Sequence, residues 1–71
     1  MTWNYRVIKK DGYLGIHGVY YDEAGKIKSW DLEPNAPLGD DLEDLRNRLE
    51  LMLESLDKEV LDFALLERDA F

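Results

Sequence analysis

The chain has 71 residues and no cysteine, so disulfide bonds and thiolate zinc sites are excluded. A chain of this length forms one domain at most, whose core rarely contributes more than roughly 3–5 kcal/mol of stability without disulfides, metals or oligomerisation. The net charge of −7 disfavours direct binding to nucleic acid or anionic lipid, because an acidic surface repels phosphate.

The charge is distributed unevenly along the chain. Residues 1–39 hold five acids and five bases, whereas residues 40–71 hold eleven acids and four bases and carry the whole net charge. This pattern is typical of a solvated helix face, and the alternative is an acidic surface that binds basic protein or imitates nucleic acid. No apolar run reaches the length of a signal peptide core or of a membrane span, so we expect a soluble cytoplasmic protein.

Residues 1–32 have the pattern of three antiparallel strands. Aromatic and β-branched residues occupy alternate positions over 3–8, and Asp11-Gly12 is a two-residue hairpin turn that tolerates positive φ. Residues 13–21 are rich in the same residue types, and a second tight turn at 22–25 precedes a third strand at 26–32. We therefore predict a three-stranded antiparallel meander.

A connector, residues 33–39, separates this sheet from a helical segment at 40–57. It contains two prolines and ends in Gly39, which is typical of an ordered loop within one domain. Asp40 is the expected N-cap, with Glu43 three residues later as in a capping box. The apolar residues that follow are spaced by three or four and predict one amphipathic helix from about residue 41 to residue 56: Leu42, Leu45, Leu49, Met52, Leu53 and Leu56.

The predicted fold class is α+β, a single domain in which the long helix packs across one face of the sheet. The residues expected to meet are Leu45, Leu49, Met52 and Leu56 from the helix, and Tyr5, Val7, Ile16 and Trp30 from the sheet. On this packing, replacing Leu49 with alanine should cost about 2–5 kcal/mol. The remaining segment, 58–71, fits a short C-terminal helix or a short fourth strand, and the helix is favoured.

The polar residues do not form a recognisable catalytic or metal-binding motif. His17, Ser29 and Asp31 lie on neighbouring predicted strands, but a small sheet with one helix offers no enclosed cleft with oxyanion donors. The carboxylates are scattered, and the glycines lack the spacing of a phosphate-binding loop. We therefore expect no catalytic site, no metal and no cofactor, and we expect His17 to be a half-exposed strand residue.

The aromatic residues suggest a binding surface. Six of the eight lie before the connector, and the adjacent Tyr20 and Tyr21 must face opposite sides of the sheet. One helix covers one face only, so aromatic residues on the second face are expected to contact a protein partner or a second copy of the chain. The candidate partner-binding residues are Tyr13, His17, Val19, Tyr20, Tyr21 and Trp30. The alternative is that loops and the C-terminal segment cover this face.

The order of three strands, a connector and an acidic capped helix resembles the N-terminal domain of HicB-like antitoxins. The resemblance rests on the start of the helix and on the prolines of the connector: Gly39, Asp40, Leu42, Glu43, Leu45, Pro34 and Pro37. The family's P-D-L-P-G element is missing, and its threonine position is Asp41 here. The chain also resembles short uncharacterised bacterial proteins that begin MTWNYRV and contain a G-x-H-x-V-Y-Y-D-x-x-G hairpin.

Together these features predict a non-enzymatic protein-binding or regulatory module, antitoxin-like or adaptor-like, that forms a homodimer. The alternative function is an acidic inhibitor that imitates nucleic acid, as some phage counter-defence proteins do. Its phosphate-like row would comprise Asp40, Asp41, Asp44, Glu50, Glu54 and Asp57, although Arg46 and Arg48 interrupt that row. A small enzyme is the least favoured class.

Overall fold

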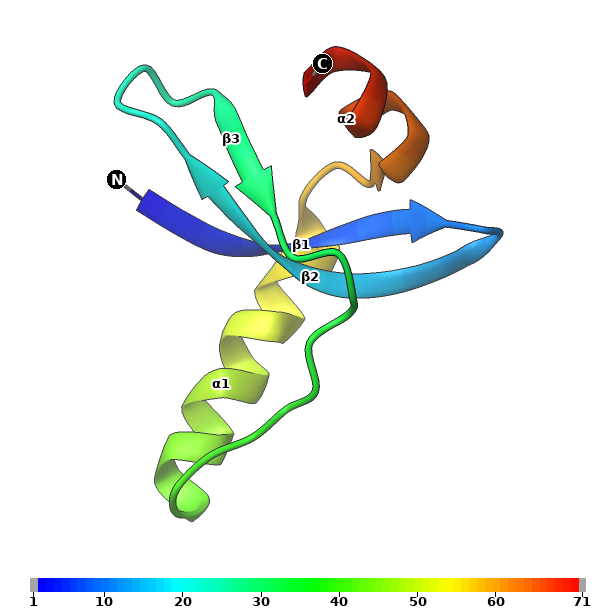
Figure 1. Ribbon diagram of the computed structural model, residues 1–71. Helices are drawn as coiled ribbons and strands as arrows, with labels where there is room; N and C mark the ends of the chain where they lie inside the picture. Colours follow the sequence, from blue (N-terminus) through cyan, green and yellow to red (C-terminus); the bar gives the residue numbers. More distant parts are fainter. Residues whose placement is uncertain (1, 71) are drawn as a thin grey trace.

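The computed structural model describes residues 2–70 as a curled four-stranded sheet with two helices (Figure 1). The strands are β1 (Thr2–Lys10), β2 (Tyr13–Tyr21), β3 (Ile27–Trp30) and β4 (Leu61–Asp62), and the helices are α1 (Leu42–Glu54) and α2 (Phe63–Ala70). A short 3₁₀ helix, η1 (Ser55–Asp57), continues α1. The predicted α+β class is confirmed.

The sheet has the order β3-β2-β1-β4. The first three strands are antiparallel, as the sequence predicts, and β4 is parallel to β1, which makes the sheet mixed. Asp11 and Gly12 both have positive φ, at 53° and 83°, as a two-residue hairpin turn requires. The third strand is shorter than predicted, because the chain leaves the sheet after Trp30.

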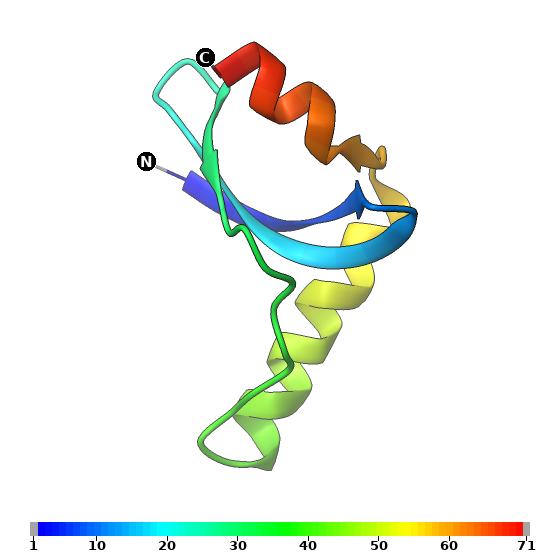
Figure 2. The ribbon, with the colours of Figure 1, turned by 45° about the vertical axis from the view of Figure 1, so that its right-hand side comes forward.

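The strand register divides the sheet residues between two faces. The first, here called the α1 face, carries Trp3, Tyr5, Val7, Ile16 and Tyr20. The second, here called the α2 face, carries Ile8, His17, Val19, Tyr21 and Trp30. The helices lie on opposite sides of the curled sheet, and α2 lies on its concave side (Figure 2).

The N-cap of helix α1 lies one residue later in the chain than predicted. Asp41 is the N-cap, and its carboxylate accepts a hydrogen bond of 2.8 Å from the backbone N–H of Asp44. The Asp44 carboxylate in turn accepts the N–H of Asp40 at 3.0 Å. The prediction of an Asp40–Glu43 capping box is therefore wrong by one position, because it is the extended backbone of Asp41 that turns its side chain toward the first helical N–H groups.

The predicted packing of α1 on the sheet is correct only in part. Met52 is buried and Tyr5 and Val7 are buried opposite it, but Leu49 and Leu56 are about half exposed or more. Trp30 lies on the other face. The physical reason is the angle of α1 to the sheet. The C-terminal end of this helix lies against the sheet, and its first half extends beyond the strands (Figure 1).

The C-terminal segment forms both of the structures that its sequence allowed. Two residues of β4 pair with β1, and α2 follows directly and covers the α2 face. Phe63 meets Trp30 edge to face, with ring centroids 6.3 Å apart, and the Arg6 guanidinium donates to the Glu59 carbonyl oxygen at 2.8 Å. In the described part of the chain, neither helix is both long and apolar enough to cross a membrane.

Candidate protein-binding groove

The structure does not bring the six predicted partner-binding residues together on one exposed surface. His17 and Val19 are 1% and 0% exposed, and Tyr21 and Trp30 are half-buried on the same side. The remaining two are separated from them: Tyr20 lies on the α1 face, and Tyr13 is exposed at the tip of the β1–β2 hairpin. The expectation of an uncovered second face is wrong, because the C-terminal segment covers it.

His17 is a core residue and not the half-exposed strand residue expected from the sequence. Its Nδ1 lies 2.8 Å from the backbone carbonyl oxygen of Asp31, so Nδ1 carries the proton and donates it. Ser29 pairs with Tyr20 and therefore lies on the opposite face of the sheet from His17. Within residues 2–70, no group of three or more histidine, cysteine or acidic side chains is arranged to hold a metal ion.

Asp31 fastens the connector to the sheet. Its carboxylate accepts hydrogen bonds from the Tyr20 hydroxyl at 3.2 Å and from the Asn35 side-chain amide at 2.9 Å. Its backbone N–H donates to the Gly18 carbonyl oxygen at 2.9 Å, and the backbone N–H of Asn35 donates to the Ile16 carbonyl oxygen at 2.8 Å. The connector is therefore held against β2, where it forms one wall of a groove.

The Asp31 carboxylate raises the pKa of Tyr20 above its ordinary 10.0, chiefly by charge repulsion of the phenolate, with burial and the hydrogen bond adding to the effect. We expect Asp31→Asn to return the pKa of Tyr20 toward that value, as measured by NMR titration of ring-labelled tyrosine. Because the folded-state pKa is raised, this contribution to stability is complete below pH 10.0 and is lost as the pH rises through the folded-state pKa. Glu33→Gln, on the exposed connector, is the matched control, and an unchanged pKa of Tyr20 in Asp31→Asn would contradict the assignment.

A groove of about 540 Å³ lies between the connector, the β1–β2 hairpin and α1. Its walls are apolar, apart from Asn35 and the backbone: Val7, Leu14, Gly15, Ile16, Pro37, Leu49, Met52, Leu53 and Leu56. The groove continues along the exposed side of α1 over a hollow lined by Leu42, Leu45, Arg46, Leu49, Glu50 and Leu53. The two share Leu49 and Leu53, so they form one continuous apolar surface.

Five leucines of this surface are largely exposed, and we call them the leucine surface. Their exposed fractions are 65% for Leu14, 82% for Leu42, 47% for Leu49, 65% for Leu53 and 60% for Leu56. Single exposed leucines are common on protein surfaces, but a contiguous row of them marks an interaction site.

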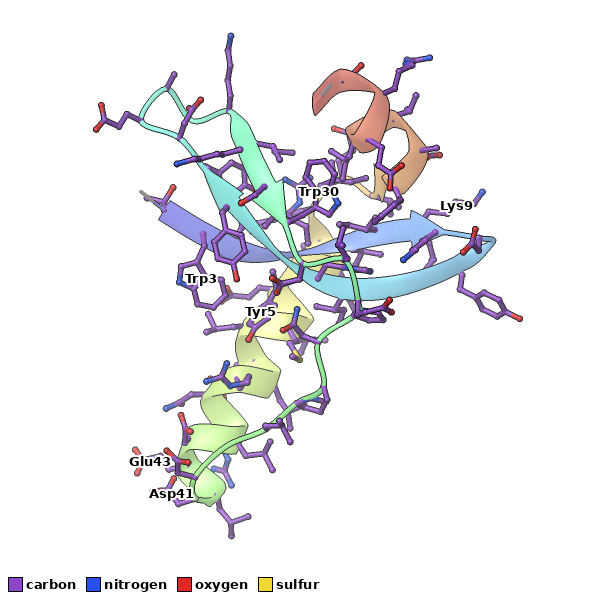
Figure 3. All side chains as sticks on the ribbon, in the orientation of Figure 1. Trp3, Tyr5, Lys9, Trp30, Asp41 and Glu43 are labelled. Atoms are coloured by element: carbon purple, nitrogen blue, oxygen red, sulfur yellow. The ribbon has the colours of Figure 1, made fainter. Side chains whose placement is uncertain are left out.

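Charged residues surround the leucine surface on the helix side. Arg46 and Glu50 line it directly, while Asp41 and Glu43 lie at the end of α1 that is far from the sheet (Figure 3). Arg48 points the other way and donates to the Tyr5 hydroxyl at 2.9 Å, and this hydrogen bond raises the pKa of its guanidinium. The surface is therefore apolar along its length and mainly acidic at its far end.

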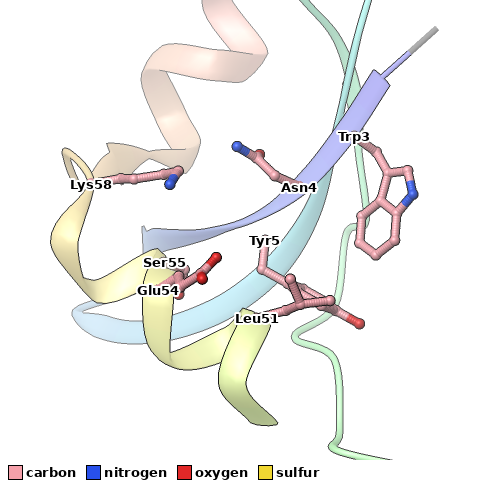
Figure 4. A pocket seen from close by; sticks show the side chains of 7 residues that line it. All are labelled: Trp3, Asn4, Tyr5, Leu51, Glu54, Ser55 and Lys58. Carbon is pink, nitrogen blue, oxygen red and sulfur yellow. The ribbon is translucent and has the colours of Figure 1, made fainter. Parts of the chain in front are cut away.

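A second, smaller pocket of about 100 Å³ lies on the other side of α1, beside Trp3, Asn4 and Lys58 (Figure 4). Pockets that hold organic ligands are usually about 300–1,000 Å³. The smaller pocket is below this range, whereas the groove beside the leucine surface lies within it.

The sequence did contain a signal for the leucine surface. Seven apolar residues lie within 42–56, and they occupy an arc of the helix wider than a single core-facing stripe: Leu42, Leu45, Leu49, Leu51, Met52, Leu53 and Leu56. Only Met52 among them is buried. The width of the stripe therefore indicated that part of it would stay uncovered by a small sheet.

Comparisons of the chain with protein-family models, with curated proteins and with solved structures find no match.

Proposed function

We propose that this chain is a non-enzymatic protein-binding module whose binding site is the leucine surface with the groove beside it. The observation that carries the proposal is the continuity of the two apolar hollows through Leu49 and Leu53. An amphipathic helix from a partner suits such a site, because its apolar side chains, spaced by three or four residues, can occupy a groove of this kind.

The energy available from this surface is large enough for specific binding. Burying a leucine side chain completely yields about 1.5–3 kcal/mol, so the exposed parts of these five leucines yield about 5–10 kcal/mol. The partner buries a comparable apolar area at the same time. Association costs about 4–15 kcal/mol, and the combined gain from both sides can exceed this cost.

The antitoxin-like or adaptor-like class remains our proposal for the biological role. Its support is the resemblance in strand order and in the residues at the start of α1, from Gly39 to Leu45. The nucleic-acid mimic is less well supported, because Arg46 lies among the acidic residues on the exposed side of α1 and would repel a nucleic-acid-binding surface.

The test is photo-cross-linking in living cells of the natural host. We expect Leu53→p-benzoylphenylalanine to give a discrete cross-linked protein adduct, because position 53 lies where both hollows meet. The matched control carries the same residue at Lys28, which is exposed on β3 and away from α1. Absence of an adduct from position 53 and from position 42, in chains with native circular dichroism spectra, would disprove the proposal.

A further inference from the structure

We infer that the partner on the leucine surface is a second copy of this chain, with the two α1 helices antiparallel about a two-fold axis near the middle of the helix. This inference rests on the proposed function, because it uses the same surface. It goes further by naming the occupant and its orientation.

The core of one copy is small. Among the described residues only five hydrophobic side chains are buried: Tyr5, Val7, Ile8, Val19 and Met52. The chain has no cysteine with which to add a disulfide. Domains of this size usually gain the missing stability from a disulfide, a metal or oligomerisation. A second copy of the chain is present wherever the chain is made, so it can supply the missing apolar contacts every time the protein folds.

The shape of the surface also suits a second copy of the chain. Leu42, Leu49 and Leu53 recur at helical spacing along one side of α1, which is about 20 Å long at 1.5 Å per residue. A two-fold dimer requires one patch that is complementary to itself, and a straight ridge of leucines satisfies this requirement. The groove beside the ridge extends the contact onto Leu14 and Leu56.

The charges beside the leucine surface select the antiparallel orientation. Arg46 and Glu50 lie one helical turn apart and line the same side of the leucine surface. Neither forms an ion pair or a side-chain hydrogen bond within residues 2–70 of its own copy. In an antiparallel pair, Arg46 of each copy faces Glu50 of the other, which gives two ion pairs. In a parallel two-fold pair, this side of each helix would lie on opposite edges of the contact, so Arg46 and Glu50 of the two copies would not meet.

The net charge gives the dimer a distinctive salt dependence. Each copy carries −7, so two copies repel one another at long range. Salt screens this repulsion, so self-association should tighten as salt increases. Binding of a basic partner to the same acidic chain should weaken instead.

The first experiment is sedimentation equilibrium of the purified chain over the micromolar range. We expect a monomer–dimer equilibrium whose dissociation constant falls when sodium chloride increases from about 50 mM to about 500 mM. A monomer at every concentration and salt condition would overturn the inference. If position 53 cross-links to a different protein in cells while the purified chain stays monomeric, the inference fails and the proposed function stands. If neither position 53 nor position 42 gives an adduct, the proposed function fails as well.

The second experiment tests the orientation by charge reversal. We expect Arg46→Glu and Glu50→Arg each to weaken self-association about tenfold or more, because each creates two like-charge contacts per dimer. An equimolar mixture of the two variants should form a heterodimer about as tight as the wild type, since both cross-chain ion pairs are then restored. Mixing does not restore an ion pair between residues 46 and 50 of the same helix. Recovery of the dimer therefore reports contact between the two copies.

The control variant is Glu67→Arg, on exposed α2. It changes the net charge as Glu50→Arg does but should not bind Arg46→Glu preferentially. If a single variant is unfolded because it cannot dimerise, mixing should restore both its circular dichroism spectrum and its dimer mass. A mixture that gains neither, or an Arg46→Glu chain that pairs with the wild type in preference to Glu50→Arg, overturns the antiparallel dimer.

Discussion

Replacement of His17 with alanine is expected to lower the free energy of unfolding by about 3–5 kcal/mol. The imidazole is 1% exposed, so its removal leaves a cavity in the core. It also removes the 2.8 Å hydrogen bond to the Asp31 carbonyl oxygen. A histidine at an exposed strand position would change the free energy of unfolding by about 1 kcal/mol or less. Urea denaturation at fixed protein concentration, followed by circular dichroism, measures it.

Two further variants separate the two causes. His17→Leu fills most of the volume but leaves the Asp31 carbonyl oxygen without its donor, and it should cost about 1–3 kcal/mol. His17→Asn keeps a donor near the position of Nδ1 but leaves a cavity. If His17→Ala is as stable as the wild type to within about 1 kcal/mol, the core position of this residue is wrong.

Replacement of Met52 with alanine should destabilise the protein by about 2–5 kcal/mol. Met52 is 5% exposed and is the one buried residue of α1, so it is the main apolar contact of this helix with the sheet. Because a core of this size supplies roughly 3–5 kcal/mol in total, α1 should detach or the chain should unfold. Thermal denaturation and tryptophan fluorescence, which reports on Trp3 beside α1 and on Trp30 on the other face of the sheet, both measure the change.

The matched control is Leu32→Ala, which truncates an exposed side chain of the connector. It should change the free energy of unfolding by less than about 0.5 kcal/mol. The effect of Leu49→Ala on the free energy of unfolding should lie between those of Met52→Ala and Leu32→Ala, because Leu49 is about half exposed in one copy. Its larger effect should be on self-association and not, as predicted from the sequence, a loss of about 2–5 kcal/mol of stability. Equal effects of Met52→Ala and Leu32→Ala would show that α1 is not held by Met52.

The local structure of this protein is determined by its sequence. Asp11-Gly12 adopts the two positive φ angles that its residue types favour. Alternation over residues 3–8 identifies β1, and the run of aromatic and β-branched residues over 13–21 identifies β2. The leucine spacing likewise identifies α1 to within about two residues at each end. These features depend on interactions between residues close in the chain, so their pattern is visible without the fold.

Which surfaces are covered was decided only by the tertiary structure. The sequence of residues 58–71 has no clear period. Strand β4 forms because it pairs with β1 at two positions, and α2 is placed by the contact of Phe63 with Trp30. His17 and Val19 are buried on the α2 face and are therefore removed from the predicted interface. The angle of α1 across the sheet leaves the leucine surface exposed in their place. Alternation and helical spacing say which residues share a face, but burial of that face depends on distant segments whose positions result from the packing of the whole chain.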